Sequence, residues 1–312
     1  MIAPEIPLVQ DGQILSVDLV NSLIGRTEYA ADLLRQYKLI AGDNISIERQ
    51  FDGTRVNAEV EAKFNIVGTA VVGGITKGFL YDGSTFTDII YPGASYTDAN
   101  GIDGSNIVGA AIIGGAAKGF LYNGSTFTDI IYPGKFNLIA RGINGSNIVG
   151  DVRHGSPSGA QRGFLYNGSS FTDIVYPSAN YTLATGIDGS NIVGFAGTGG
   201  LVQKGFLYNG STFTDIAYPG SIQISANGID GSNIVGQAVI GGALKAFLYD
   251  GSNLTDIIYP GSTDNSARAI DGSNIVGLTI VGGISKGFLY NGSTFTDIIY
   301  PGASSTRPNG IG

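Results

Sequence analysis

Residues 101–134 read GIDGSNIVGAAIIGGAAKGFLYNGSTFTDIIYPG, and close copies of this stretch fill the chain from residue 65 onward. Successive copies are spaced 41 to 44 residues apart, a period that suits the four-stranded blade of a β-propeller. The copies lack the apolar 3.6-residue periodicity that a helical repeat needs. Three short runs mark each copy. Asn-Ile-Val-Gly begins at Asn65, Asn106, Asn147, Asn191, Asn233 and Asn274, and Phe-Leu-Tyr begins at Phe79, Phe120, Phe164, Phe206, Phe247 and Phe288. Thr-Asp-Ile begins at Thr87, Thr128, Thr172, Thr214, Thr255 and Thr296.

Each copy predicts four antiparallel strands joined by tight turns. In the second copy, Asp103-Gly104 and Asn123-Gly124 are dipeptides that accept the positive φ of a hairpin. The Asn-Gly-Ser runs also match the acceptor for N-glycosylation, but we interpret them as turns, which need Asn-Gly in any case. The strands predicted for this copy are Thr97–Ile102, Ser105–Ile113, Lys118–Tyr122 and Thr126–Tyr132.

A basic and an acidic residue recur at fixed positions in every copy. A two-residue turn fixes the register of a hairpin, so Lys77 is expected opposite Asp88. Phe79 is expected opposite Phe86 on the same face. The aspartates could be read as a ring of metal ligands, but a cation stands beside each, so we interpret them as cross-strand ion pairs. The same pairing recurs as Lys118/Asp129, Arg162/Asp173, Lys204/Asp215, Lys245/Asp256 and Lys286/Asp297.

The two ends of the repeat region complement each other. Residues 306–312 match the first strand of a copy, as in 97–102, whereas residues 56–61, before the first copy, do not. We therefore expect the C-terminal strand to become the inner strand of the blade that begins at Asn65, which closes the ring and leaves few free edges. The prediction is an all-β, six-bladed propeller over residues 65–312, with an open stack as the alternative.

Residues 1–64 differ from the repeat in composition. They hold 16 charged residues, against 26 in the rest of the chain. Ser16 and Thr27 can each cap a short helix, and a hairpin is expected around Asp52-Gly53. Because so polar a segment forms a poor core alone, we predict a docking or oligomerisation segment that packs on another copy of itself or on a larger assembly.

Composition excludes several classes of function. The chain has 312 residues, a net charge of −8, one His and no Cys. The acidic balance argues against nucleic acid, and the Cys and His counts exclude thiolate sites and a histidine-based metal site. We expect no cofactor and no metal. The first residues lack the features of a secretory signal, and no apolar stretch reaches the roughly 20 residues that span a membrane.

Over residues 65–312 the repeat resembles the HAF family of extracellular repeats. The resemblance rests on Gly-Phe-Leu-Tyr-Asp/Asn-Gly-Ser, Phe-Thr-Asp-Ile-x-Tyr-Pro-Gly and Gly-Ile-Asp-Gly-Ser-Asn-Ile-Val-Gly. That family occurs in bacterial surface proteins, including those of cyanobacteria. The resemblance implies extracellular display and no particular chemistry.

Residues 19–47 are similar to the N-terminal parts of tail fibre and baseplate-associated proteins of cyanophages. The piece Ala41-Gly-Asp-Asn-Ile-Ser-Ile, an extended segment before a small β element, is typical of phage fibres. The resemblance implies that residues 1–64 bind other virion tail proteins, with a homotrimer as one arrangement. It also explains display without a secretory signal, because phage proteins leave the host by lysis.

Candidates for catalysis are few. His154, the one histidine, lies within residues 151–162, and we expect it to be exposed on a loop. A glycan-cleaving enzyme needs only two carboxylates, and Asp98, Asp151 and Asp264 are the aspartates that neither turns nor ion pairs explain. We predict no catalytic residues and keep a glycan depolymerase as the third alternative.

Variation among the copies falls on one face of the predicted propeller. The turns between strands one and two and between strands three and four are nearly identical, whereas the other two connections diverge. A rigid scaffold with one diversified loop face is a common way to present a binding site, although neutral drift of loops would look the same. The predicted ligand-binding residues are Tyr96, Phe136 and Tyr181 for stacking, and Asp98, Arg141, Gln223, Asp264, Arg268 and Arg307 for hydrogen bonds.

These patterns together predict a non-enzymatic phage tail protein whose propeller binds a receptor or glycan on the host surface. The expected location is the virion tail. A cyanobacterial extracellular repeat protein of scaffold type, located outside the cell or on its surface, is the second interpretation.

Overall fold

The computed structural model describes residues 45–51, 56–62, 64–200 and 202–312. The chain divides into two units, 1–63 and 64–312, and each is described by itself. In the first unit, β1 (Ile45–Phe51) and β2 (Val56–Ala62) pair antiparallel along their whole length. This confirms the predicted hairpin. The two predicted helices lie outside the described residues.

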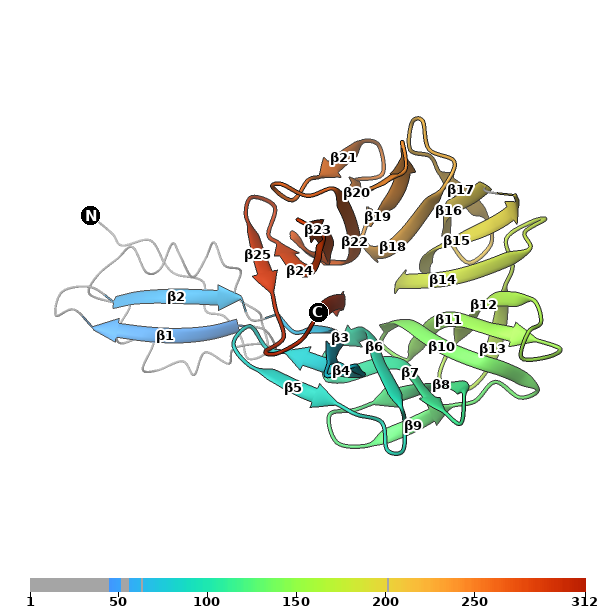
Figure 1. Cartoon of the computed structure of the whole chain (residues 1–312), viewed down its shortest axis with the longest axis horizontal. Coiled ribbons are helices and arrows are strands. Elements are labelled where there is room, and N and C mark those ends of the chain that lie inside the picture. Colours follow the sequence, from blue (N-terminus) through green and yellow to red (C-terminus); the bar gives the residue numbers. More distant parts are fainter. Residues whose placement is uncertain (1–44, 52–55, 63, 201) are drawn as a thin grey trace, which may run out of the picture. The chain divides into compact units, whose positions relative to one another are not determined.

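The second unit is a six-bladed β-propeller (Figure 1). Blade 1 consists of β26 (Ser305–Ile311), β3 (Ile66–Val72), β4 (Ile75–Tyr81) and β5 (Phe86–Ile89). Blade 2 consists of β6 (Tyr96–Asp103), β7 (Asn106–Ile113), β8 (Ala116–Tyr122) and β9 (Phe127–Ile130). Blade 3 consists of β10 (Lys135–Asn144), β11 (Asn147–His154), β12 (Gln161–Tyr166) and β13 (Phe171–Ile174). Blade 4 consists of β14 (Tyr181–Asp188), β15 (Asn191–Gly199), β16 (Val202–Tyr208) and β17 (Phe213–Ile216). Blade 5 consists of β18 (Ile224–Asp230), β19 (Asn233–Ile240), β20 (Ala243–Tyr249) and β21 (Leu254–Ile257). Blade 6 consists of β22 (Asp264–Asp271), β23 (Asn274–Val281), β24 (Ile284–Tyr290) and β25 (Phe295–Ile298).

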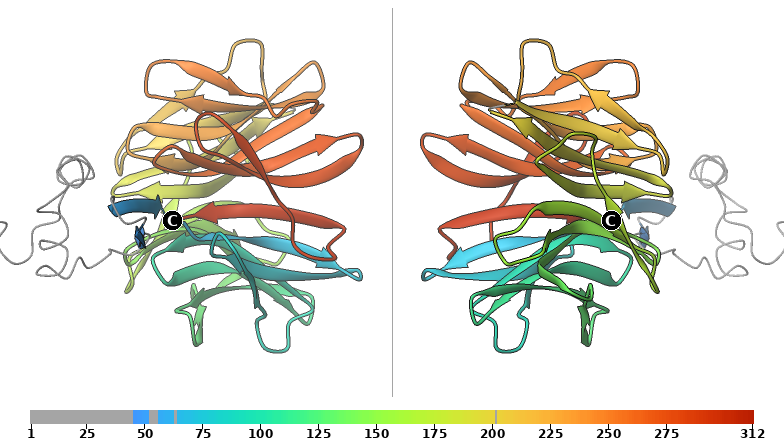
Figure 2. Two further views of the ribbon diagram at one scale, coloured as in Figure 1. Left: turned by 90° about the vertical axis from the view of Figure 1, so that its left-hand side faces the viewer. Right: turned by 90° about the vertical axis from the view of Figure 1, so that its right-hand side faces the viewer.

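The C-terminal strand closes the ring, as predicted. β26 pairs antiparallel with β3, from Ser305 opposite Val71 to Ile311 opposite Ile66. Figure 2 shows this last strand beside the first strands of the propeller. Blades 1 and 2 also share one parallel pair between β4 and β6, whereas blades 3 to 6 form separate four-stranded sheets. The all-β, six-bladed architecture predicted from the repeat is therefore confirmed.

The hairpin between the third and fourth strands is longer than predicted. In blade 1, Tyr81 pairs with Phe86 and Phe79 pairs with Asp88, so the expected pairing of Phe79 with Phe86 is wrong. The Asp82 side chain accepts hydrogen bonds from the backbone N–H groups two and three residues later, at 2.9 and 2.7 Å. This side-chain turn stabilises a four-residue loop in place of a two-residue turn.

All six predicted ion pairs form despite the changed register. Lys77 lies diagonally across from Asp88, not opposite it, and its Nζ is 2.7 Å from the carboxylate. Both residues stand on the same sheet face because side chains alternate along a strand. The other N–O distances are 3.2 Å for Lys118–Asp129, 3.4 Å for Arg162–Asp173, 2.6 Å for Lys204–Asp215, 4.0 Å for Lys245–Asp256 and 3.1 Å for Lys286–Asp297.

The core lies between blades. The phenylalanine of every Phe-Leu-Tyr run is fully buried, and each such side chain contributes about 1.5–3 kcal/mol of hydrophobic stabilisation. One cluster joins Val67 and Ile89 of blade 1 to Ile107 and Phe120 of blade 2. The repeated motif therefore stabilises the ring by packing each blade on the next.

A tyrosine–aspartate hydrogen bond also joins every pair of neighbouring blades. The tyrosine of each Tyr-Pro run donates its hydroxyl to the ion-paired aspartate of the following blade. Sequence reasoning assigned these aspartates one partner each, and the structure gives each of them at least two. The bonds are Tyr91–Asp129, Tyr132–Asp173, Tyr176–Asp215, Tyr218–Asp256, Tyr259–Asp297 and Tyr300–Asp88.

Candidate functional site

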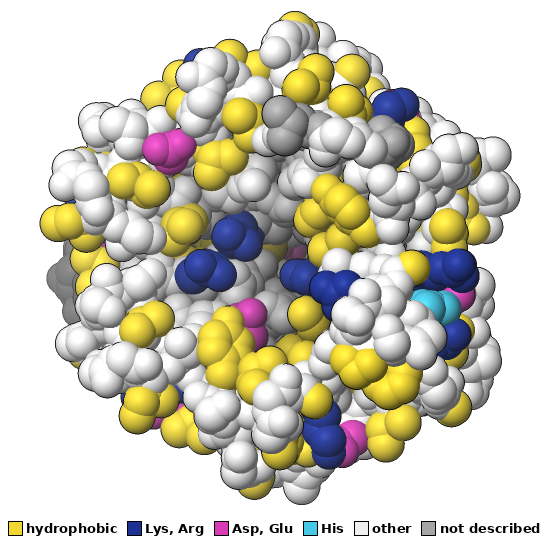
Figure 3. Space-filling model, turned by 45° about the vertical axis from the view of Figure 1, so that its right-hand side comes forward, with side chains coloured by type: hydrophobic (Ala, Val, Ile, Leu, Met, Phe, Trp, Pro, Cys, Tyr) yellow, Lys and Arg dark blue, Asp and Glu magenta, His cyan; other side chains and the backbone are white. Residues whose placement is uncertain are grey.

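The six inner strands bring polar side chains together at one face of the propeller. This variable face carries the connections between second and third strands, such as residues 155–160, and those between blades, such as residues 90–95. Figure 3 shows the face that bears the chain's one histidine (cyan), with a hollow at its centre. Basic side chains gather around this hollow, with acidic side chains among them.

In four blades, one position of the inner strand binds the next blade. An asparagine or threonine there donates a side-chain hydrogen bond to a backbone carbonyl of the following inner strand. These bonds fix the spacing of the strands around the hollow. They are Asn100 to Ala140 (2.9 Å), Thr185 to Ala226 (2.7 Å), Asn227 to Ala267 (2.7 Å) and Asn309 to Ala99 (3.1 Å).

The other two blades carry arginine at this position, and the two arginines have different surroundings. Arg141 forms an ion pair with Asp151, which is 1% exposed and also accepts a 2.5 Å hydrogen bond from Gln161. In blade 6 the residue equivalent to Asp151 is Leu278. Arg268 therefore lacks the carboxylate that neutralises Arg141, and its Nε atom is buried without a hydrogen-bond partner among the described residues.

One carboxylate, that of Asp98, lies beside these arginines. It accepts hydrogen bonds from Thr69, from Asn309 at 3.0 Å and from Tyr96 at 3.4 Å. Burial, and next the negative charge of Asp98, raise the pKa of Tyr96 to about 12. Asp98 is therefore held by neighbours from blade 1 and by Tyr96 of its own strand.

The pKa of Arg268 shows that charges from four blades share the hollow. Burial, and next the positive charges of Arg307 and Arg141, lower this pKa to about 10, while the negative charge of Asp98 acts in the opposite direction. Arg307, on β26, is exposed at this end of its strand. We call the site made by Tyr96, Asp98, Arg141 with its partner Asp151, Arg268 and Arg307 the central hollow.

The other four predicted residues lie outside this cluster. Phe136 is 40% exposed at the start of β10. The Tyr181 hydroxyl donates a 3.1 Å hydrogen bond to Gln203. The backbone of Gln203 forms an isolated parallel β-bridge with that of Gln223. Asp264 accepts a 2.8 Å hydrogen bond from the backbone N–H of Leu244 in blade 5.

His154 is not the exposed loop residue that the sequence predicted. β11 extends to His154 and β12 begins at Gln161, so the loop is shorter than residues 151–162. The His154 side chain is 13% exposed, lies 3.3 Å from Asp173 and contacts Lys135 Nζ at 2.8 Å. Burial lowers its pKa below the usual 6.5, and Lys135 does so too. The ring is therefore neutral near pH 7.

Asp98, Asp151 and Asp264 each accept hydrogen bonds from within the propeller. No group of three His, Cys, Asp or Glu side chains that could hold a metal ion occurs within the described ranges. Among these residues, no helix is long and apolar enough to cross a membrane.

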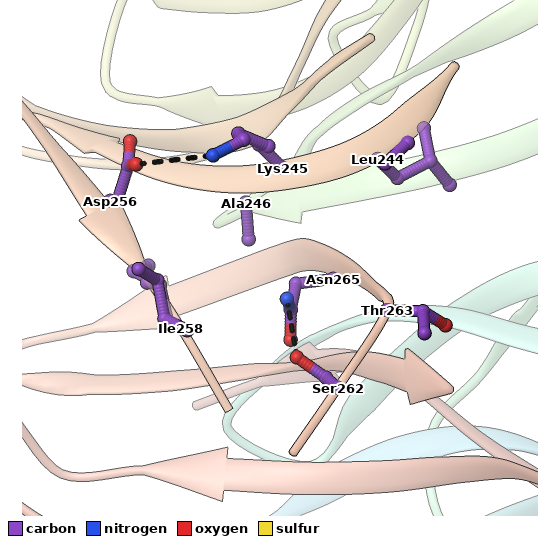
Figure 4. A pocket seen from close by; sticks show the side chains of 10 residues that line it. Leu244, Lys245, Ala246, Asp256, Ile258, Ser262, Thr263 and Asn265 are labelled. Carbon is purple, nitrogen blue, oxygen red and sulfur yellow. Dashed lines mark hydrogen bonds and ion pairs between the residues drawn. The ribbon is translucent and has the colours of Figure 1, made fainter. Parts of the chain in front are cut away.

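A small pocket between blades 5 and 6 is the other candidate (Figure 4). Its volume is about 120 Å³, below the roughly 300–1,000 Å³ of ordinary ligand pockets. Its polar side chains already have partners, since Lys245 faces Asp256 and Asn265 binds Ser262 at 2.8 Å. This pocket suits a few water molecules better than a ligand.

Sequence reasoning missed the residues that surround the central hollow. Thr69, Gln161 and Asn309 bind its carboxylates, and Ser266 lies on the same strand as Arg268. Aligning the six copies column by column would not have marked Gln161, because its column varies and holds a second glutamine, Gln203. Asn309 would have escaped, because asparagine is common at its position.

Comparisons with known proteins identify the fold. No protein-family model and no curated protein matches the chain. The β-propeller domain of the Trilobed protease from Pyrococcus furiosus matches with a TM-score of 0.51 and 10% identity, covering 82% of this chain and 87% of that one. A chain of the nidogen/laminin complex matches with a TM-score of 0.51 and 12% identity, over 80% and 97%. The SapL1 lectin, solved with α-methyl fucoside, matches with a TM-score of 0.51 and 13% identity, over 84% and 98%.

The structural matches show that the chain shares the propeller fold with a protease domain, a chain of the nidogen/laminin complex and a lectin. At identities this low, the likeness extends to the fold alone. It transfers no activity. Because no family model and no curated protein matches, the resemblances to HAF repeats and to phage proteins stay predictions.

Proposed function

We propose that the propeller is a non-catalytic glycan-binding module and that it binds through the central hollow and its rim. The observation that carries the proposal is the convergence of Asp98, Arg141, Arg268 and Arg307 from four blades at one face. Hydrogen-bonding groups that converge in a concave site fix the orientation of a polar ligand. Phe136, 40% exposed at the rim, offers an apolar ring on which a sugar can stack.

The surroundings of the carboxylates favour binding over hydrolysis. A glycosidase needs one carboxyl group to deliver a proton and a second to attack or to activate water. Asp151 is buried against Arg141 and Gln161, and Asp98 accepts three hydrogen bonds. These contacts support a structural or binding role for both carboxylates.

The SapL1 lectin supports carbohydrate as the ligand class, because its propeller has the same fold and was solved with α-methyl fucoside. The proposal for the whole chain follows the sequence resemblances. Residues 1–64 dock to other proteins of a phage tail, with a homotrimer as one arrangement, and the propeller projects towards the host surface from the virion tail. A cyanobacterial extracellular scaffold is the second candidate.

A glycan array and isolated cyanobacterial envelope, probed with the full-length chain and with a deletion of residues 1–64, test this proposal. Equal binding by both proteins is expected, because the binding groups lie in the propeller. Binding to no glycan and no envelope would contradict the proposal and favour a scaffold. Release of reducing sugar from the envelope would instead identify a depolymerase. Detection of the protein in purified virions would separate the tail protein from the cellular scaffold.

A further inference from the structure

Two buried polar atoms without partners belong to residues two positions apart on β22. In the described part of the chain, Ser266 Oγ and Arg268 Nε are two of three buried side-chain N or O atoms that have no hydrogen-bond partner. The third, on His154, lies 3.3 Å from Asp173. Ser266 is 3% exposed. Native proteins rarely leave such atoms unsatisfied, so this pair suggests a missing binding partner.

Blade 2 shows that these two positions of the inner strand meet in space. The residues equivalent to Ser266 and Arg268 are Asp98 and Asn100. One amide nitrogen, that of Asn309, contacts both of them, at 3.0 and 3.5 Å. Blade 2 thus supplies its own carboxylate at a place where blade 6 has a hydroxyl group beside a guanidinium group.

The charges in the central hollow leave a cation without a partner. Arg141, Arg268 and Arg307 contribute three positive charges, while Asp98 and Asp151 contribute two negative ones. Asp151 is engaged by Arg141, and the three hydrogen bonds to Asp98 come from Thr69, Tyr96 and Asn309, so among the described residues no carboxylate forms an ion pair with Arg268. An uncompensated buried charge is costly. A bound anion would therefore be favourable beside Arg268.

We propose that Ser266 and Arg268, with Arg307 at the entrance, bind a carboxylate or sulfate group on an acidic sugar. The inference rests on the proposed glycan-binding function and names its ligand class. Guanidinium groups bind flat or tetrahedral oxyanions through paired, charge-assisted hydrogen bonds, and the Ser266 hydroxyl can donate one more. A neutral sugar has no group that would neutralise Arg268.

The test uses the full-length chain and an array of matched glycans. Each acidic member, carrying a uronic acid, a sialic acid or a sulfated sugar, stands beside its neutral parent. We expect acidic members to bind and their neutral parents to bind at least about tenfold more weakly. Equal binding of both members of every pair would overturn the inference.

Variants locate the charge that is responsible. Arg268→Gln should weaken acidic-glycan binding by about tenfold, and Ser266→Ala by a smaller factor. Lys245→Gln, which removes an equal charge from the blade 5 ion pair, should leave binding unchanged. If Lys245→Gln weakens binding as much as Arg268→Gln, the effect is one of net charge and the inference is wrong. Should Arg268→Gln fail to fold, as judged by circular dichroism, Ser266→Ala and Arg307→Gln carry the same test.

A calorimetric titration with sodium sulfate separates an acidic glycan from a free anion. Glycan binding that exceeds sulfate binding and depends on Arg268 supports the inference. Sulfate binding with no glycan binding would contradict both this inference and the proposed function. Glycan binding that shows no preference for acidic members and is unchanged in Arg268→Gln would contradict the anion site alone and leave the proposed function standing.

Discussion

The hydroxyl of Tyr300 donates a 2.6 Å hydrogen bond to Asp88, which lies 212 residues earlier in the chain. The bond joins blade 6 to blade 1, and the same bond recurs between all other neighbouring blades. Closure of the ring therefore rests on three contacts: the pairing of β26 with β3, the buried phenylalanines between blades, and this tyrosine–aspartate bond.

Tyr300→Phe should destabilise the propeller modestly. A hydrogen bond to a partly exposed carboxylate is worth about 1 kcal/mol, which corresponds to a fall of roughly 2–4 °C in Tm for a domain of this size. Tyr290→Phe is the matched control, because the Tyr290 hydroxyl binds Gly292 within its own exposed turn. Thermal unfolding followed by circular dichroism measures both variants. Equal Tm values for the two would contradict a closing role for Tyr300.

Gly287→Ala should destabilise the junction of blades 6 and 1. A Cβ atom at residue 287 would lie 2.5 Å from the rigid ring of Pro308, and overpacking of this kind costs about 1–3 kcal/mol. Blade 5 has alanine at the equivalent position, Ala246, which packs in one cluster with Ala267, the equivalent of Pro308.

The double variant Gly287→Ala/Pro308→Ala reproduces that alanine pair. It should regain part of the stability lost by Gly287→Ala alone, because a Cβ at residue 287 would still lie 2.9 Å from the backbone oxygen of Ile298. Urea unfolding of the two single variants and the double variant forms a double-mutant cycle. Additive losses in the double variant would show that the clash with Pro308 is not the cause.

The inter-blade carboxylates predict loss of stability in acid. Burial alone would raise the pKa of Asp88, but hydrogen bonds from Lys77 and Tyr300 outweigh it and hold this pKa below the usual 3.8. The pKa values of Asp129, Asp215 and Asp297 are lowered in the same way. A group with a lowered folded-state pKa contributes stability that is present above its unfolded pKa and is lost as pH falls through the folded value.

The urea midpoint should therefore fall as the pH drops below about 4. Asp88→Asn should lower the urea midpoint at pH 7. It should also make the fall of the midpoint below pH 4 (the acid limb) less steep, because one titrating group is gone. An unchanged acid limb in Asp88→Asn would contradict the assignment.

The tyrosines that bind the inter-blade aspartates predict a second loss of stability, at alkaline pH. The hydrogen bond to Asp256, and then burial, raise the pKa of Tyr218 to about 12, and the pKa values of Tyr91 and Tyr259 are also raised. A phenol with a raised folded-state pKa contributes stability that is complete below its unfolded pKa of 10 and is lost as pH rises through the folded value. Urea midpoints between pH 9 and 12 should decline, and less steeply in Tyr218→Phe. A midpoint that does not change over this range would contradict the prediction.

Repetition made most of the fold predictable from the sequence. Six copies of one strand pattern fixed the blade count, and the match between residues 306–312 and residues 97–102 located the closing strand. The register predicted for the hairpin between the third and fourth strands was wrong. The Asp82 side chain stabilises a four-residue loop there, in place of a two-residue turn at Asp82-Gly83.

Contacts between blades could not be read from one copy. The Tyr300–Asp88 hydrogen bond depends on how neighbouring blades are placed relative to each other around the propeller axis. The period of the repeat does not specify that placement. The candidate site was partly predictable, since Asp98, Arg141 and Arg268 stood out as departures from the repeat. The lack of an ion-pair partner for Arg268 was not predictable, because it depends on the contact between the inner strand and its neighbour. In that neighbouring strand, Leu278 stands where blade 3 has Asp151.

The most direct measurement is photo-crosslinking of the full-length chain with the tightest-binding array glycan, followed by mapping of the labelled peptides. The account predicts labels on the variable face, in peptides containing residues 96–98, 136–141 and 264–268. Arg268→Gln should reduce this labelling, in line with the roughly tenfold loss of binding expected for that variant. Labels on the opposite face, at the hairpin loops such as residues 82–85 and 123–126, or within residues 1–63, would contradict the central hollow as the binding site.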